Sequence, residues 1–525
     1  MTVSQVLPGL WMLTGLPSHG GQCVNSFVVS DTVGVTLVDP GVDVDSALIA
    51  QIELDRIDRI LITHVHRENV AGVANFPGVP VFVEEGDRYL CDGEVAYRSK
   101  LRIWEPPWEW ETRGNFEGDL AGALNERPPV DGMQNVQGVQ AGDRVGNFDV
   151  LSTPGHGKHA LTFLATLHGR RIAFAGDAIL ASGKILNWFD IDWDYGLHGG
   201  QIALLKSLHL LRKHLPDLIL PTHGDVIETP NADLDSVISV LARIVEAEPI
   251  RSPVSPTAAS ATMVSADWAQ LSPHLFQWRN LWGNANLIVS DDGYGLMIDD
   301  GLCQWIDLAA RKDRHDRAIA EIRKITGVNK IEVIIPTHYH GDHIENIPDL
   351  QRIEPEVRVI SLDVVADPIE YPTRYNLACP LPWYGTAYDT VRIDSRVTSG
   401  DVIRWRGHEL EIFHLGGQTY HHAGIDVRID GRRVLFVGDS ISLHDGIDPI
   451  LTYNDCDPET RGWVYAMDRA IERTPDLIVA GHAVAAINPM PFLLAKREAW
   501  RQRISQFQAL SPYPSLRAFF DPFTA

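Results

Sequence analysis

The chain carries the same order of strand-like segments and polar motifs twice, and this repeat limits its fold more than any other feature. Asp39-Pro40-Gly41 corresponds to Asp299-Asp300-Gly301, and segment 169–177 corresponds to segment 431–439. The two copies are separated by about half of the 525 residues, whereas solenoid repeats have periods of about 20–50 residues. The sequence therefore predicts the duplication of a whole domain.

The second copy has a histidine-rich motif directly after an apolar segment. Residues 337–343 read Thr-His-Tyr-His-Gly-Asp-His and follow the apolar run 331–335, which is typical of a buried strand. Three imidazoles and a carboxylate at the end of a core strand are hard to explain by packing. This ligand set suits zinc, with iron and manganese as rivals. The first copy has a weaker version at 63–69, after the apolar run 60–62.

These motifs, taken in order, resemble those of the metallo-β-lactamase superfamily. The resemblance rests on the His-x-His-x-Asp-His motif, a later Gly-Asp and a final histidine, and it covers nearly the whole chain, once in each half. It implies an α+β fold class, with two αββα metallo-β-lactamase-type sandwich domains in tandem. It also implies metal sites at one edge of each sandwich, held by loops that follow strands.

For the second half, the resemblance implies up to two zinc ions. One position would use the two histidines that open the motif, the other would use the ligands that follow, and one aspartate would bridge both. In that order the expected ligands are His338 and His340, then Asp342, His343 and His482, with Asp439 as the bridge. Asp342 is also the expected catalytic residue, because it would position the nucleophile and move a proton to the leaving group.

A glutamine stands where the family has a further histidine in the second half. Gln418 precedes the Gly-Asp of its half by the same interval that separates His156 from the Gly-Asp of the first half. A glutamine carbonyl is a poorer zinc ligand than imidazole. His421, His422 or a water could fill the position instead.

The first half departs from the family pattern in the opposite way. Glu68 replaces the motif's aspartate, and Asn69 replaces the neighbouring histidine. The ligand candidates that remain are His64, His66, His156, Asp177 and His223. This half is therefore expected to hold one zinc or iron ion, or to be a decayed copy that is kept as a scaffold.

Composition and helical periodicity predict the domain boundaries. Residues 1–248 form the first predicted domain, 249–265 form a linker rich in Pro, Ser and Ala, and 266–525 form the second domain with the main metal site. A helix is predicted at 233–246, where apolar residues recur at helical spacing, and its counterpart is predicted at 492–507.

Aromatic residues gather at equivalent places in the two halves. Segment 101–129 contains three tryptophans, and segment 371–388 contains four tyrosines and one tryptophan. Such segments are typical of pocket walls, lids or hydrophobic contacts between domains. We expect the two domains of one chain to pack on each other in a pseudo-twofold arrangement. The sequence is also compatible with a homo-oligomer.

Composition also limits the partners. The net charge of −24, from 69 acidic and 45 basic residues, disfavours long nucleic acids. No secretory signal and no apolar run of about 18 residues is visible, so neither export nor a membrane partner is expected. The five cysteines are scattered, which is typical of reduced thiols in a cytoplasmic protein.

The expected activity is hydrolysis of a small molecule. A metal-bound hydroxide would attack an ester, thioester, lactone or amide, and no Gly-x-Ser-x-Gly nucleophile motif is present. One alternative is redox chemistry like that of mononuclear iron dioxygenases, favoured by the ligand set of the first half. Others are phosphodiester hydrolysis and, with both sites decayed, a non-enzymatic binding protein.

Overall fold

The computed structural model describes most of the chain. The described residues are 2–15, 24–93, 96, 129, 131–186, 188, 190–191, 199–246, 252–279, 281, 283–301, 308–372, 381, 388–443 and 462–512. The three tryptophans of the aromatic segment 101–129 lie outside this set, as do most residues of segment 373–387.

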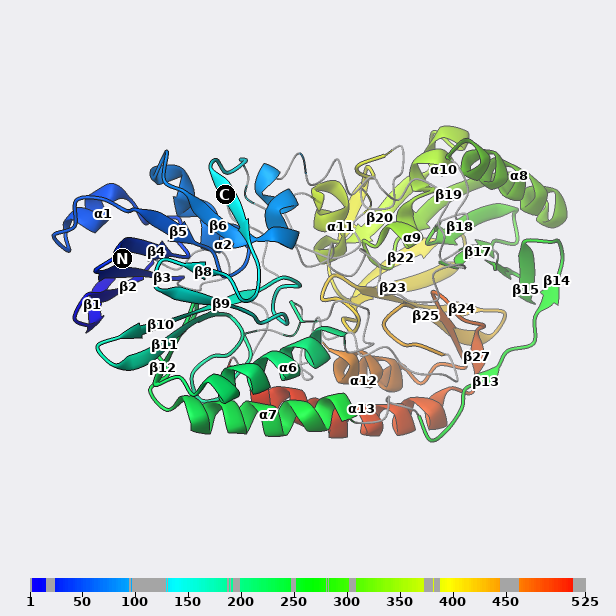
Figure 1. The fold of residues 1–525 in the computed structure, drawn as a ribbon. Helices are drawn as coiled ribbons and strands as arrows, with labels where there is room; N and C mark the ends of the chain where they lie inside the picture. Colours follow the sequence, from blue (N-terminus) through cyan, green and yellow to red (C-terminus); the bar gives the residue numbers. More distant parts are fainter. Residues whose placement is uncertain are drawn as a thin grey trace. The chain divides into compact units, whose positions relative to one another are not determined.

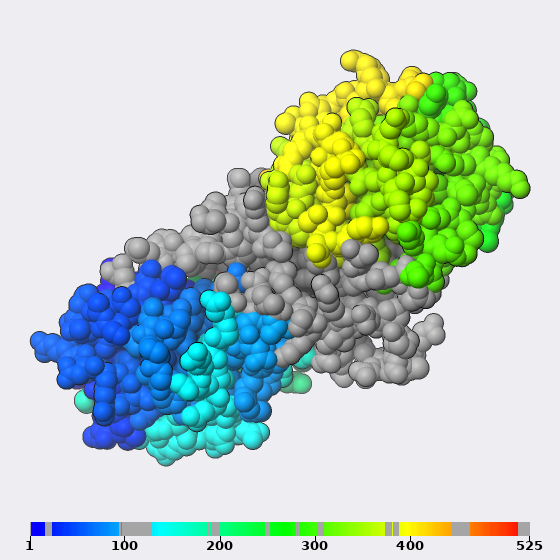
Figure 2. Space-filling view, turned by 90° about the horizontal axis from the view of Figure 1, so that it is seen from above, coloured from blue at the N-terminus to red at the C-terminus, as the bar shows by residue number. Residues whose placement is uncertain are grey.

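The chain divides into two compact units (Figure 1). The first comprises Met1–Leu101, Asn115–Glu248 and Gln506–Ala525, and the second comprises Arg102–Gly114 and Pro249–Ser505. The end of the chain, which the sequence placed in the second domain, thus groups with the first unit. In the space-filling view of Figure 2, blue and cyan residues cover the visible face of the first unit, and green to yellow residues cover that of the second.

The first unit contains two mixed sheets. In the larger sheet the strands follow chain order, antiparallel as far as β4 and parallel from β4 onward. Its strands are β1 (Thr2–Leu7), β2 (Leu10–Thr14), β3 (Asn25–Asp31), β4 (Gly34–Val38), β5 (Arg59–Leu61), β6 (Val81–Glu84) and β7 (Val136–Val139). The smaller sheet, ordered β12-β11-β10-β9-β8, consists of β8 (Arg144–Val145), β9 (Phe148–Ser152), β10 (Leu161–Leu167), β11 (Arg170–Gly176) and β12 (Leu218–Pro221).

Apolar side chains from both sheets form the central core of the first unit. Phe174 packs edge-on against Phe27 and Phe148, with ring centroids 5.6 Å away in each pair. A second core fills the other face of the larger sheet, beneath α1 (Ser46–Ala50) and two 3₁₀ helices. Figure 1 shows α6 (Gly199–His214) and α7 (Pro230–Glu246) along the smaller sheet. The order of layers is therefore helix, sheet, sheet, helix, as predicted.

The second unit has the same layers, and each of its two sheets has more strands than its counterpart in the first unit. Its larger sheet runs in chain order through β14 (Thr262–Met263), β15 (Trp268–Ser272), β16 (Leu275–Trp278), β17 (Ala285–Val289), β18 (Tyr294–Ile298), β19 (Lys330–Ile335), β20 (Arg358–Leu362) and β21 (Ser395–Val397). The other sheet runs in the order β13 (Thr257–Ala258), β27 (Ala486–Ile487), β26 (Leu477–Ala480), β25 (Arg432–Gly438), β24 (Ala423–Ile429), β23 (His408–His414) and β22 (Asp401–Trp405). Its helices are α8 (Leu308–Thr326), α9 (Gly341–Ile344), α10 (Ile347–Ile353), α11 (Asp363–Glu370), α12 (Trp463–Arg473) and α13 (Met490–Leu510), whose residues from Gln506 onward belong to the first unit.

The segment predicted as a linker contributes two short strands to the second unit. β13 pairs with β27, and β14 pairs with β15. Low periodicity over 249–265 hid these strands, because each spans only two residues. No helix among the described residues has the length and apolar character that crossing a membrane requires.

The end of α13 packs on the segment that follows β11 in the first unit. The rings of Phe507 and Trp188 meet edge to face with centroids 4.6 Å apart, and both residues are almost fully buried. The backbone N–H of Ile185 donates to the carbonyl of Leu510 at 2.9 Å. These contacts hold Ile185 and Trp188 in place.

Phe507→Ala should therefore destabilise the first unit. Removing a buried aromatic ring leaves a cavity and typically costs about 3–5 kcal/mol. Urea unfolding, followed by fluorescence, measures the change, and Gln508→Ala on the exposed side of the same helix is the control. A loss below about 1 kcal/mol would show that this contact stabilises little.

Candidate metal centre

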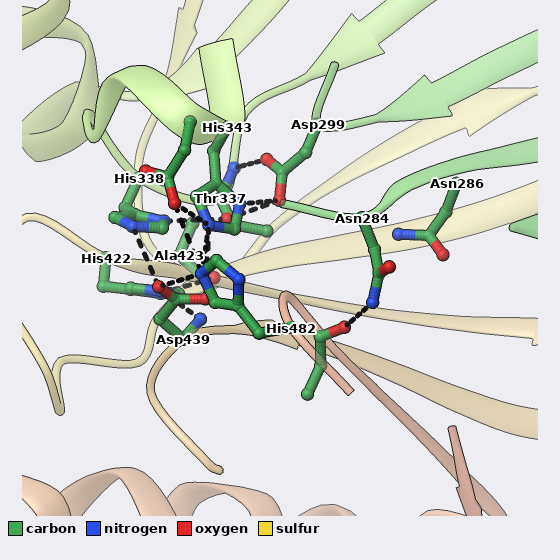
Figure 3. Close-up of polar contacts among 12 residues, drawn as sticks. Asn284, Asn286, Asp299, Thr337, His338, His343, His422, Ala423, Asp439 and His482 are labelled. Atoms are coloured by element: carbon green, nitrogen blue, oxygen red, sulfur yellow. Dashed lines mark hydrogen bonds and ion pairs between the residues drawn. The ribbon is translucent and has the colours of Figure 1, made fainter. Parts of the chain in front are cut away.

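The second unit brings its polar motifs together at the carboxyl ends of parallel strands. β18 and β19 are parallel, and so are β25 and β26. His338 and His340 follow β19, Asp439 follows β25, and His482 follows β26. Loops on a rigid sheet thus place side chains from distant parts of the sequence at one edge (Figure 3).

Asp299 fixes the first of these loops and one histidine. Its carboxylate accepts hydrogen bonds from the backbone N–H and the hydroxyl of Thr337, the latter at 2.8 Å. It also accepts from Nδ1 of His343 at 3.0 Å. A histidine held at one ring nitrogen by a carboxylate presents the other nitrogen in a defined direction, as metal-ligating histidines do.

Three side chains converge on that nitrogen, Nε2 of His343. Nε2 of His343 lies 3.2 Å from Asp439 Oδ1, 3.4 Å from His482 Nε2 and 3.8 Å from Asp342 Oδ2. Nε2 of His482 lies 3.0 Å from Asp439 Oδ2 and 3.3 Å from Asp342 Oδ2. All four residues offer ligand atoms within 4.8 Å of one another, so they could hold one ion together.

A second group shares Asp439. His338, His340 and Asp439 also offer ligand atoms within 4.8 Å of one another, and His338 Nε2 is 3.8 Å from Asp439 Oδ2. The Nε2 atoms of both histidines are buried and have no hydrogen-bond partner among the residues that the structure describes. Burial of an unpaired polar atom is costly, so these nitrogens fit a metal better than an apolar core.

The electrostatics of the site also favour a cation. Burial lowers the pKa of His338 well below its usual range and that of His340 to about 4, which leaves both imidazoles neutral, as ligation requires. Burial alone would also lower the pKa of His343 and His482. The nearby carboxylates of Asp439 and Asp342 instead raise both pKa values, to about 10 for His482. The carboxylates therefore create a field that attracts positive charge.

Gln418 lies beside the shared aspartate. Its amide donates to Asp439 Oδ2 at 3.1 Å, and the side chain is buried. Among the described residues, the two groups of the second unit that could hold an ion include neither His421 nor His422. His422 Nε2 accepts the backbone N–H of Asp439 at 3.2 Å, and its ring stacks on His338. His421 Nδ1 lies 2.6 Å from the carbonyl oxygen of Val364.

Gln418→His should therefore tighten the binding of a metal at His338 and His340. Imidazole is the better ligand, so we expect an affinity gain on the order of tenfold, about 1.4 kcal/mol. Zinc titration against a chromogenic chelator measures it. His421→Ala is the comparison, and it should leave the affinity unchanged. If His421→Ala strips the metal while Gln418→His gains nothing, His421 completes the site instead.

The first unit assembles three histidines in the same way. Ligand atoms of His64, His66 and His156 lie within 4.8 Å of one another, and all three side chains are buried. Asp177 Oδ2 lies 3.5 Å from His64 Nε2 and 3.6 Å from His156 Nε2. His223 approaches Asp177 with Nδ1, at 2.9 Å. His64, His66 and Asp177 thus come together as their counterparts in the second unit do. His156 has no histidine counterpart there, and His223 approaches the aspartate with Nδ1 where His482 uses Nε2.

The first unit lacks a histidine at the position that would hold the second metal. Asn69 stands where the second unit has His343, and its amide lies 3.2 Å from the ring nitrogens of His64. Asp39, the counterpart of Asp299, accepts a hydrogen bond from the hydroxyl of Thr222 at 3.2 Å instead of a histidine Nδ1–H. The first unit therefore offers the chemistry of one metal position.

In each unit an asparagine supports the loop that carries the last histidine of the motif. Asn284 donates through Nδ2 to the carbonyls of Ala480 and Ala483, at 3.1 and 3.0 Å, on either side of His482. Asn25 donates in the same way to Pro221 and Gly224. Both asparagines lie at or next to the start of a strand of the larger sheet, and only the duplication could have marked them as a pair.

Known protein families include one with the same motifs and fold. The model of a family described as the metallo-beta-lactamase superfamily matches residues 20–223 and 281–482, once in each unit. The chain belongs to the metallo-β-lactamase superfamily. Superfamily membership and the histidine–aspartate clusters together support divalent-metal binding and a function of the metallo-hydrolase type.

Individual relatives each cover a little under half of this chain. The uncharacterized protein YobT of Bacillus subtilis (strain 168) is 25% identical over 240 residues, which is 44% of this chain and 94% of that protein. A metallo-beta-lactamase family protein from Thermus thermophilus is 22% identical, with a TM-score of 0.32, over 46% of this chain and 81% of its own. An archaeal superfamily protein from Sulfolobus tokodaii is 19% identical, with a TM-score of 0.31, over 47% and 90%.

Proposed function

We propose that this chain is a metal-dependent hydrolase of small molecules and that the second unit carries the reaction. The observation that supports this most is the sharing of Asp439 by two ligand groups, one with His338 and His340, the other with Asp342, His343 and His482. A shared carboxylate is what brings two cations close enough to act on one water and one substrate.

The bound metal would supply Lewis acidity and lower the pKa of a bound water from 15.7 to roughly 7. The protein's own part is to orient and to move a proton. Asp299 holds His343 through Nδ1, and His422 holds the backbone of Asp439. Asp342, 3.3 Å from His482 Nε2, lies where it could accept a proton from the nucleophile and pass it to the leaving group.

The exposure of the cluster favours substrate entry at one side. The side chain of His482 is 32% exposed, whereas those of His338 and His343 are fully buried. A substrate carbonyl would therefore reach the site past His482. No nucleophilic serine or cysteine is needed, so an ester, thioester, lactone or amide is the proposed substrate class.

A substrate panel tests this proposal. The purified chain, reconstituted separately with zinc, manganese or iron(II), is assayed on a nitrophenyl ester, a thioester, a lactone, an anilide and a bis(nitrophenyl) phosphate. Hydrolysis of a carboxyl substrate that chelator abolishes and metal restores is the expected result. Turnover of the phosphodiester alone, or oxygen consumption with the iron form alone, would contradict it in favour of the corresponding activity.

A further inference from the structure

The first unit contains a buried aspartate that neither the family motif nor the duplication assigns to a site. Asp190 lies thirteen positions after Asp177 in the chain, and it is 1% exposed. Its Oδ2 is 3.5 Å from His156 Nε2. We infer that Asp190 is a ligand of the metal in the first unit, the carboxylate that makes up for the ligands replaced by Glu68 and Asn69.

The distances fit ligands of one ion better than hydrogen bonds. His156 Nε2 lies 3.5 Å from Asp190 Oδ2 and 3.6 Å from Asp177 Oδ2, which is too long for a good N–H···O bond. Two ligand atoms about 2.1 Å from a shared five-coordinate metal are about 3.0–3.6 Å apart where the angle between them is about 90–120°. Neither ring nitrogen of His156 has a hydrogen-bond partner among the described residues, although the side chain is only 2% exposed.

The charges fit as well. Three neutral imidazoles, from His64, His66 and His156, leave a divalent ion with its full charge in a buried place. The carboxylates of Asp177 and Asp190 cancel that charge, and an ion pair is tolerated in a protein interior only when its charges are compensated. A second carboxylate also moves the donor set toward oxygen, which favours iron or manganese over zinc more than three histidines alone would.

Contacts within the first unit hold the described residues that precede Asp190 in the chain. Leu180 and Lys184 bond to each other across a short bridge, and the N–H of Ser182 donates to Asp233 on α7 at 2.9 Å. Further along, Trp188 packs against Phe507. A ligand that follows such fixed residues needs less reorganisation to bind a metal.

Metal binding by the first unit can be measured separately from the proposed hydrolase activity. Asp439→Ala combined with His343→Ala in the full chain removes the shared carboxylate and a further ligand of the larger group, so the metal that remains reports on the first unit. In this background, Asp190→Asn keeps the shape and hydrogen-bonding capacity of the side chain but loses its charge. Asp149→Asn is the matched control, since its side chain is 60% exposed on the same unit.

Three readouts are taken with cobalt(II), iron(II) and zinc: metal per chain, affinity by chelator competition, and the metal-induced rise in Tm. We expect Asp190→Asn to weaken binding by tenfold or more, to change the cobalt(II) absorption and to lose the rise in Tm. Asp149→Asn should match the background. His156→Ala combined with Asp190→Asn should lose less than the product of the single effects, because both act on one ion.

Two results would overturn the inference. One is wild-type affinity and an unchanged cobalt(II) spectrum in Asp190→Asn, which would mean that Asp190 only accepts a hydrogen bond, since an amide can do the same. The other is a background variant that binds no metal in the first unit. Should Asp190→Asn unfold, Asp190→Glu replaces it. That variant keeps the charge but shifts the carboxylate by one methylene, so it should fold and still weaken binding.

Discussion

His343→Ala should lose metal from the second unit and most of the hydrolytic activity. His343 is fully buried, is held by Asp299 at Nδ1, and faces Asp439, Asp342 and His482 with Nε2. Loss of a residue that only supports a ligand typically costs about 10–100-fold in metal affinity, so loss of a ligand should cost more. Elemental analysis after dialysis and chelator competition measure the change.

A surface histidine is the control for His343→Ala. His209→Ala removes an exposed imidazole from α6 and should keep the metal content, the affinity and the rate of the wild type. The metal of the first unit should stay bound in both variants. Full metal content with full activity in His343→Ala would remove His343 from the assignment.

Asp342→Asn should lower kcat by about 10²- to 10⁴-fold, the usual range for a general acid–base group. The amide cannot take up a proton, and it is a weaker ligand than a carboxylate. The pH profile should also change, because a group that accepts and returns a proton in the reaction shapes it. Initial rates at saturating metal separate this effect from weaker binding of the metal.

Asp313→Asn supplies the comparison for that loss, since it removes an exposed carboxylate from α8 in the same unit. Its rate should equal that of the wild type. If Asp342→Asn keeps its rate at saturating metal, another group handles the proton, and the proposed role of Asp342 fails.

The sequence alone was sufficient for the fold because the repeat and the motifs depend on order along the chain. Apolar runs marked strands such as β19, and helical spacing marked α7. The strands β13 and β14 were missed, because two residues carry no periodicity. The grouping of Gln506–Ala525 with the first unit was also missed, because it depends on contacts of Phe507 and Leu510 with residues more than 300 positions away.

The candidate site shows a similar division. The motif residues are brought together as predicted, but their role as ligands stays a prediction. From the sequence, His422 could be a metal ligand or could only support the site. The structure favours support, because His422 Nε2 accepts a hydrogen bond from the backbone N–H of Asp439. Asp190 carried no sequence signal at all, because its position relative to His156 is set by the folding of a loop.

The hydrolysis rates of two metal-loaded variants, His340→Ala in the second unit and His66→Ala in the first, test most directly which unit carries the reaction. Both residues are buried histidines at matching places in the two motifs, so the changes are alike in size and burial. We expect His340→Ala to lose most of the activity and His66→Ala to keep the wild-type rate. The reverse pattern, or equal rates in both variants, would contradict the assignment of catalysis to the second unit.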